Sequence, residues 1–136
     1  MGLEEDDEQE TEDASVKVVC RFRPFNSVEE KASTEANPFL VTTSSVRDLS
    51  KGYLYERFDS VCDESSSQAH VYDVACTDLV SDLLRGFNVG LFAYGQSGGG
   101  KSYSLLGREG SLQDEEFKGI IPRSNQNSEL YSLTLS

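Results

Sequence analysis

Residues 95–102 have the types and the spacing that a binding site for a nucleoside triphosphate needs. They read GQSGGGKS, which matches the phosphate-loop pattern G-x-x-x-x-G-K-[ST] at every fixed position. Glycines allow backbone N–H groups to approach phosphate oxygens, because no Cβ atom stands in the way. We expect the Lys101 ammonium to contact the β- and γ-phosphates and the Ser102 hydroxyl to bind Mg²⁺. The loop therefore predicts a site for a nucleoside triphosphate and its magnesium ion.

The residues on either side of the loop favour this interpretation. Residues 89–94 form a nearly continuous apolar run, which is typical of a buried central strand, and they lead directly into the loop. A helix is expected to begin at Lys101 and to direct the positive end of its dipole at the phosphates. A flexible glycine-rich linker, which is the alternative, would rarely follow such a strand. The order of strand, glycine loop and helix is the context that the motif requires.

Further strands are expected before the loop. Residues 16–22 alternate and contain β-branched side chains, so they predict a strand that Arg23 and Pro24 end. Residues 53–58 carry aromatic side chains in a second strand pattern, and shorter strands are expected at 38–42 and 46–49.

One longer helix is expected between these strands and the loop. Ser65 and Gln68 have the spacing of a capping box, and Gly86 is a natural stop. Residues 26–37 and 59–67 are expected to be irregular or turn-rich connections. The helix should present one apolar face made of Val71, Val74, Ala75, Leu79, Leu83 and Leu84. Strand, helix and strand in this order predict an α/β fold.

The charge of the chain is unevenly distributed. The net charge is −12, but residues 3–13 hold eight acidic side chains and no basic one. The rest of the chain holds 16 acidic and 12 basic residues, a net charge of −4. This balance excludes a nucleic-acid-binding protein that works through bulk positive charge. Residues 1–15 are expected to form an acidic disordered tail, with an arm that docks on a partner as the alternative.

Cysteine and histidine usage argues against a metal site built from these two residue types. Cys20, Cys62 and Cys76 lack metal-ligand spacing, and their odd number suits a reducing compartment. The single His70 excludes a multi-histidine site and is expected on a helix surface. No apolar run is long enough to span a membrane, and the acidic N-terminus is unlike a signal peptide, so a soluble intracellular chain is expected.

Five segments between residues 16 and 123 occur together in a fixed order. Residues 91–107 contain FAYGQSGGGKSYSLLG, and the other four segments read RFRPFN at 21–26, FDSV at 58–61, QAHVY at 68–72 and GIIPR at 119–123. In order and approximate spacing they resemble the first part of a kinesin motor domain, with its F-A-Y-G-Q-T-G-S-G-K-[ST]-Y-T-M-x-G, R-x-R-P-x-N, F-D-x-V-F, Q-x-x-V-Y and G-I-I-P-R segments. Ser97 replaces the usual Thr and Gly99 the common Ser, and neither change abolishes a phosphate loop.

The resemblance adds an adenine site to the phosphate loop. Arg21, Arg23 and Pro24 match residues that line the adenine in kinesins, and Tyr103 matches a ring that approaches the base. Guanidinium planes and a proline ring stack on a purine face. Solvent-facing arginines on an edge strand are the alternative. The candidate binding residues for ATP and Mg²⁺ are Arg21, Arg23, Pro24, Gly95, Gln96, Ser97, Gly98, Gly99, Gly100, Lys101, Ser102 and Tyr103, with Ser102 as the metal ligand and no catalytic residue assigned.

The resemblance also implies a fold and a function. It implies an incomplete P-loop NTPase fold, with a central sheet and helices on both faces, that forms the nucleotide-binding N-terminal part of an ATP-driven microtubule motor in the cytoplasm. Residues 16–123 would be the motor part, and 124–136 a divergent polar end without helix or strand. The family's N-x-x-S-S-R-S-H and D-L-A-G-S-E segments do not occur in the sequence, so we expect this chain to hydrolyse little or no ATP.

Two other functions stay open at this point. The first is a non-enzymatic fragment that pairs with another protein through exposed strand edges or the acidic tail. The second is a small unrelated P-loop kinase, which is weakened because no later strand ends in an aspartate that could hold Mg²⁺.

Overall fold

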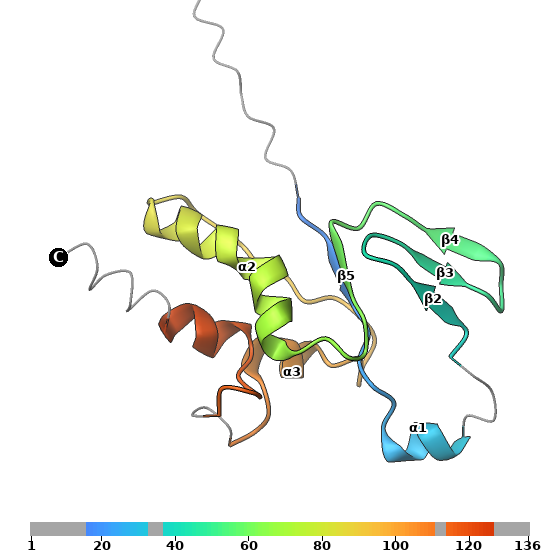
Figure 1. The fold of residues 1–136 in the computed structure, drawn as a ribbon. Helices are drawn as coiled ribbons and strands as arrows, with labels where there is room; N and C mark the ends of the chain where they lie inside the picture. The colour runs from blue at the N-terminus through green and yellow to red at the C-terminus, as the bar shows by residue number, and fades with distance from the viewer. Residues whose placement is uncertain (1–15, 33–36, 111–113, 127–136) are drawn as a thin grey trace, which may run out of the picture.

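The computed structural model describes residues 16–32, 37–110 and 114–126 (Figure 1). The predicted acidic tail and residues 127–136 of the predicted polar end lie outside the described residues. Residues 120–126 are helical. The other elements are β1 (Val19–Arg21), α1 (Ser27–Ala32), β2 (Phe39–Val41), β3 (Val46–Asp48), β4 (Tyr53–Tyr55), β5 (Ser60–Cys62), α2 (Gln68–Leu84) and α3 (Lys101–Leu106).

β1 and β5 form a two-stranded parallel sheet. Cys20 lies opposite Val61, and the pairing extends beyond the strands because the Phe22 N–H donates to the Cys62 carbonyl at 2.8 Å. The prediction of a strand over residues 16–22 is confirmed for residues 19–21. The prediction that residues 59–67 are only a turn-rich connection is wrong for β5, since three residues beside an available partner suffice to form a strand.

β2, β3 and β4 form a separate antiparallel sheet beside β5 (Figure 1). These three strands confirm the strands predicted over 38–42, 46–49 and 53–58. Asp48 is buried, and its carboxylate is stabilised there by hydrogen bonds that it accepts from the Ser50 hydroxyl and from the backbone N–H groups of Ser50 and Lys51. These bonds close the turn between β3 and β4 and lower the pKa of Asp48, the Ser50 side chain contributing most.

α1 was not predicted, because residues 26–37 were interpreted as irregular. Asn26 caps this helix: its side-chain oxygen accepts from the N–H groups of Val28 and Glu29 at 3.0 and 2.9 Å. The Glu29 carboxylate in turn accepts from the Asn26 N–H at 2.9 Å. The spacing N-x-x-E is therefore a reciprocal cap, and it is the local signal that could have revealed the helix.

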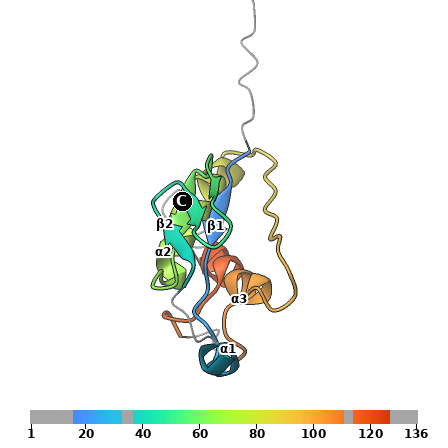
Figure 2. The ribbon, with the colours of Figure 1, turned by 90° about the vertical axis from the view of Figure 1, so that its right-hand side faces the viewer.

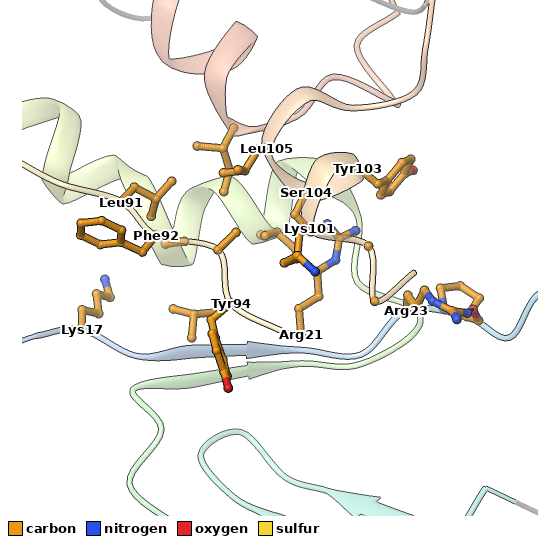
Figure 3. A pocket seen from close by; sticks show the side chains of 18 residues that line it. Lys17, Arg21, Arg23, Leu91, Phe92, Tyr94, Lys101, Tyr103, Ser104 and Leu105 are labelled. Atoms are coloured by element: carbon orange, nitrogen blue, oxygen red, sulfur yellow. Dashed lines mark hydrogen bonds between the residues drawn. The ribbon is translucent and has the colours of Figure 1, made fainter. Parts of the chain in front are cut away.

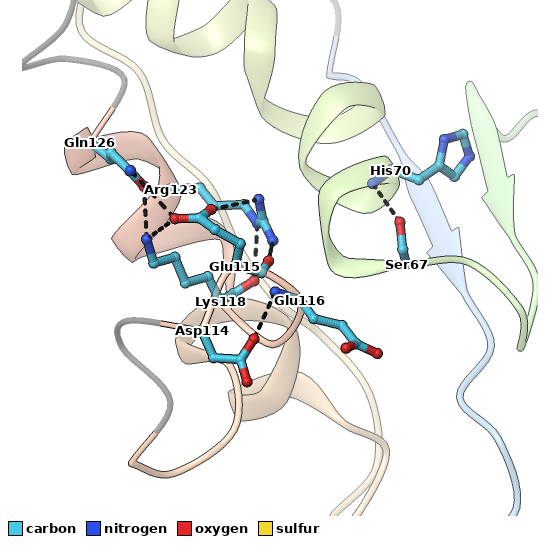
Figure 4. Close-up of polar contacts among 8 residues, drawn as sticks. All are labelled: Ser67, His70, Asp114, Glu115, Glu116, Lys118, Arg123 and Gln126. Carbon is cyan, nitrogen blue, oxygen red and sulfur yellow. Dashed lines mark hydrogen bonds and ion pairs between the residues drawn. The ribbon is translucent and has the colours of Figure 1, made fainter.

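α2 covers one face of the β1–β5 sheet. The Ser67 hydroxyl caps it by accepting from the His70 N–H at 3.1 Å, while the His70 ring lies on the exposed side as predicted (Figure 4). The predicted capping box of Ser65 and Gln68 is wrong, because the Ser65 hydroxyl donates to Asp63 and the Gln68 side chain contacts other elements. Gly86 follows the helix with a φ of 93°, which confirms it as the stop.

The core lies between α2, the β1–β5 sheet and the helical residues 120–126. The predicted apolar face of α2 is right for Val71, Val74, Ala75 and Leu79, but Leu83 and Leu84 are largely exposed because they lie at the end of the helix, outside the core cluster. Burial raises the pKa of Cys20, Cys62 and Cys76, and all three thiols are free. The buried side chains of the cluster are Cys62, Val71, Tyr72, Cys76, Val80 and Ile120.

Residues 89–94 are not a strand, which corrects the prediction of a buried central strand. They have no regular structure, and Phe92 has 92% of its surface exposed. Figure 2 shows this segment running alone on the side of β1 opposite α2. A strand needs hydrogen-bonding partners for its backbone, and in the described part of the chain no strand is paired with this segment.

The residues after the loop fold back on α3. Gly107 forms a bridge with Lys118, and the helical residues 120–126 follow with Pro122 in the first turn, where its missing N–H costs no helical bond. The prediction that residues 124–136 contain no helix is therefore wrong for 124–126. Lys118 is buried among hydrogen bonds to Glu115 and Gln126 (Figure 4).

The described residues include neither a membrane-spanning helix nor a cluster of metal-binding side chains. No helix among them has the length and apolar character that a membrane crossing requires. In the same ranges, no three His, Cys, Asp or Glu side chains are grouped so that they could hold a metal ion.

Candidate nucleotide site

The glycine loop has the backbone shape that only glycine adopts readily. Gly98 and Gly100 have φ values of 77° and 88°, and Gly100 leads directly into α3. A Cβ atom at Gly99 would lie 3.0 Å from the Gln96 carbonyl oxygen, so a side chain there would require a small shift of the loop. The predicted sequence of glycine loop and helix start is therefore confirmed.

Lys101 folds back over the loop. Its ammonium donates to the carbonyl oxygens of Gly95 and Gln96 at 2.7 and 2.8 Å. These two bonds hold the positive charge against the loop itself. Neither acceptor is a carboxylate, so the charge of Lys101 is not neutralised by them.

Arg23 fixes the loop to the end of β1. Its Nε donates to the Gly98 carbonyl at 2.8 Å, and its two terminal nitrogens donate to the Glu29 carboxylate at 2.7 and 2.6 Å. Such a bidentate ion pair fixes both the position and the plane of the Arg23 guanidinium. The Arg23 side chain, followed by the Asn26 N–H, lowers the pKa of Glu29 from 4.5 to about 2.

Arg21 connects β1 to both α2 and α3. Its Nη1 donates to the Gln68 side-chain oxygen at 2.7 Å and to the Ser104 hydroxyl at 2.8 Å. Its guanidinium carbon lies 5.4 Å from the centre of the Tyr103 ring, which is a cation–π distance. Burial lowers the pKa of Arg21, against the opposing effects of Tyr103 and Cys62.

Gln68 was not among the predicted site residues. Its side-chain nitrogen donates to the Tyr103 carbonyl at 2.7 Å, while its oxygen accepts from Arg21. The capping-box interpretation assigned this side chain to the α2 backbone and so concealed its role. The signal that could have indicated Gln68 is that it is the first residue of the Q-x-x-V-Y segment, one of the five segments that resemble a kinesin motor domain.

A cavity of about 430 Å³ lies beside the loop (Figure 3). Leu91 and Phe92 lie at one end of the cavity, and Arg23 and Tyr103 lie at the other. Between them Arg21 points from β1 toward Lys101 and Ser104. The other predicted residues Gly95, Gln96, Ser97, Gly98 and Ser102 do not line it. The predicted residues that do are Arg21, Arg23, Pro24, Gly99, Gly100, Lys101 and Tyr103.

Much of the cavity lining is apolar, and the charged side chains of the described lining are all basic. Lys17 and Arg23 are paired with the carboxylates of Asp78 and Glu29, so Arg21 and Lys101 provide the positive charge that no carboxylate of the described residues neutralises. Low-dielectric walls around charges of one sign raise the local concentration of the opposite ion. The arrangement therefore favours an anionic ligand at the end of the cavity formed by the loop.

Comparison with known proteins gives a consistent result. The sequence profile described as Kinesin motor domain matches residues 21–133. The chain is 42% identical over 112 residues to the kinesin heavy chain of Drosophila melanogaster, which covers 80% of this chain and 11% of that protein. It is 38% identical over 111 residues to kinesin heavy chain isoform 5A of Homo sapiens, covering 82% of this chain and 10% of that protein.

A solved structure of a fast kinesin, described in terms of its ATPase mechanism and its interactions with microtubules, superposes with a TM-score of 0.76 at 36% identity. The match covers 84% of this chain and 32% of that one, so the chain spans about a tenth of the curated relatives and a third of the solved motor. The match confirms the predicted α/β P-loop NTPase fold class, in partial form. The chain belongs to the kinesin motor-domain family.

Proposed function

We propose that this chain is the nucleotide-binding N-terminal part of an ATP-driven microtubule motor. The observation that carries the proposal is the glycine loop with Lys101 lining the cavity beside it, in a chain of the kinesin motor-domain family. Residues 16–123 would form this part of the motor, and residues 1–15 an acidic tail.

The loop would hold the phosphates of ATP. On binding, the Lys101 ammonium would exchange the Gly95 and Gln96 carbonyls for oxygens of the β- and γ-phosphates, which are stronger acceptors because they are charged. The Ser102 hydroxyl, one residue further along α3, would hold Mg²⁺. When bound, the ion neutralises charge on the β- and γ-phosphates.

The adenine would lie against the side chains at the end of β1. The hydrogen-bond donors of Arg23 are engaged by Gly98, Pro24 and Glu29, and Arg21 is held by Gln68 and Ser104. Arg23 would therefore contribute stacking of its guanidinium plane to a purine rather than new hydrogen bonds, and Arg21 would stack beside the Tyr103 ring. Pro24 and the Tyr103 ring complete this surface.

The wider properties follow the family. The partner would be the microtubule, through tubulin, and the protein would work on the cytoskeleton in the cytoplasm. The 136-residue chain alone is proposed to bind ATP with little or no hydrolysis, because it contains neither N-x-x-S-S-R-S-H nor D-L-A-G-S-E.

Thermal unfolding with and without Mg·ATP tests the binding site. A ligand that binds only the folded state at about 100 times its dissociation constant adds roughly 2.7 kcal/mol of stability, so the transition should move upward. Lys101→Ala should abolish the shift, while the exposed Lys51→Ala should retain it as the matched control. The same shift in Lys101→Ala, or none in the unaltered chain, would contradict the proposal.

A chimera tests the motor function. Residues 21–123 of this chain would replace the matching segment of the Drosophila melanogaster kinesin heavy chain. We expect microtubule-stimulated ATP hydrolysis by the chimera and its loss on Lys101→Ala. A folded chimera that binds Mg·ATP but is not stimulated by microtubules would contradict the motor function while leaving the nucleotide site intact.

A further inference from the structure

Gln68 is a polar side chain with only 3% of its surface exposed. It is the first residue of α2, and a glutamine at such a position is usually exposed to solvent. Both ends of its amide are used: the oxygen accepts from Arg21 of β1, and the nitrogen donates to the main-chain carbonyl of Tyr103 in α3, each at 2.7 Å. One amide therefore joins three elements that are far apart in the sequence.

Both contacts of Gln68 end on the adenine side of the proposed site. Arg21 and Tyr103 also meet each other, with the guanidinium carbon 5.4 Å from the ring centre. Ser104 completes the group, since its hydroxyl accepts from the same Arg21 nitrogen at 2.8 Å. The direction of the guanidinium plane is thus set by two acceptors and by the face of one ring.

The phosphate side is held by a different set of contacts. Lys101 bonds to the loop carbonyls of Gly95 and Gln96, and Arg23 bonds to Gly98. None of these bonds involves Gln68. Arg23 and α3 reach both ends of the site, whereas among the described residues the side-chain bonds of Gln68 reach only Arg21 and the Tyr103 carbonyl.

We propose that Gln68 is a positioning residue for recognition of the base. It orients the Arg21 guanidinium plane and fixes the main chain at Tyr103, so that the guanidinium plane and the Tyr103 ring are preorganised for a flat purine. The inference rests on the proposed nucleotide-binding function. It assigns the contribution of the base to affinity, as distinct from that of the triphosphate, to a side chain that need not touch the ligand.

The chemistry requires an amide at this position. Methionine has a similar shape but neither donates nor accepts usefully, so Arg21 would lose the Gln68 oxygen and keep the Ser104 hydroxyl as an acceptor. Glutamate still accepts from Arg21 but faces the Tyr103 carbonyl with a second oxygen, so it keeps one contact and loses the other.

Calorimetric titration of the 136-residue chain with Mg·ATP and with Mg·tripolyphosphate separates the two ends of the site. For Gln68→Met we expect Mg·ATP to bind about ten-fold more weakly, with Mg·tripolyphosphate changed less than about two-fold. For Gln68→Glu the expected loss for Mg·ATP is about three-fold, since one of the two contacts remains. Val80→Ala is the control: it removes a buried side chain from the same helix away from the site, and it should leave the ratio of the two affinities unchanged.

Each outcome decides a separate question. Equal weakening of both ligands by Gln68→Met, as a merely structural residue would give, overturns the positioning role. If Gln68→Met does not fold, an unchanged affinity ratio in Gln68→Glu overturns it instead. Failure of the unaltered chain to bind Mg·ATP overturns the proposed function itself, and with it this inference.

Discussion

β1 and residues 89–94 both carry apolar side chains and both approach the glycine loop, but they differ in what lies beside them. β1 is paired with β5 and packed against α2, so its side chains are half-buried. Residues 89–94 have no paired strand in the described chain, and Phe92 and Tyr94 are almost fully exposed. An apolar run becomes a strand only when another backbone satisfies its N–H and C=O groups.

The largest effect should come from the paired region, which consists of β1, β5 and the helix α2 packed on them. Tyr72 is 5% exposed in the core between α2 and the β1–β5 sheet. Tyr72→Ala should lower the free energy of unfolding by about 3 kcal/mol or more, because it removes a large buried ring and leaves a cavity. Urea denaturation followed by circular dichroism measures it. A loss below about 1 kcal/mol would show that this core does not hold the paired region together.

An intermediate effect should come from the contact that ties β1 to the loop. The pKa of Glu29 is lowered from 4.5 to about 2. Its pair with Arg23 therefore stabilises the fold above about pH 4.5 and ceases to do so as the pH falls through about 2. The stability difference between the unaltered chain and Glu29→Gln should be constant from pH 7 to 5 and vanish near pH 2. A difference that grows on acidification would contradict the assigned ion pair.

The smallest effect should come from the unpaired segment. Phe92→Ala removes a ring as large as a core side chain, yet 92% of the Phe92 surface is exposed. The free energy of unfolding should change by less than about 0.5 kcal/mol, as at other surface positions. The same urea titration used for Tyr72→Ala gives the comparison directly. A loss close to that of Tyr72→Ala would show that residues 89–94 are buried in solution.

Local signals were sufficient where a partner lies nearby in sequence or where the backbone shape is dictated by glycine. The loop, α3, most of α2 and the strands β1 to β4 were predictable for this reason. α1 was not predicted although its signal is local, the reciprocal cap between Asn26 and Glu29. β5 is three residues long in a turn-rich stretch, and only its pairing with β1 defines it.

The candidate site divides in the same way. The glycines and Lys101 follow from one contiguous pattern, whereas Gln68 meets Arg21 and Tyr103 across 47 and 35 residues of sequence. No local pattern encodes such a meeting. Only the packing of β1, α2 and α3 against one another brings these side chains together.

The three cysteines give the paired region a built-in reporter. Cys20, Cys62 and Cys76 lie in β1, β5 and α2, and the chain has no other cysteine. Alkylating reagents react with the thiolate, which burial suppresses in the folded chain by raising each thiol pKa. Cys62 and Cys76 are buried whereas Cys20 is half-buried, so the alkylation rate of Cys62 and Cys76 reports how often β5 and α2 open. Ligands that hold these elements together should slow the labelling of these two thiols.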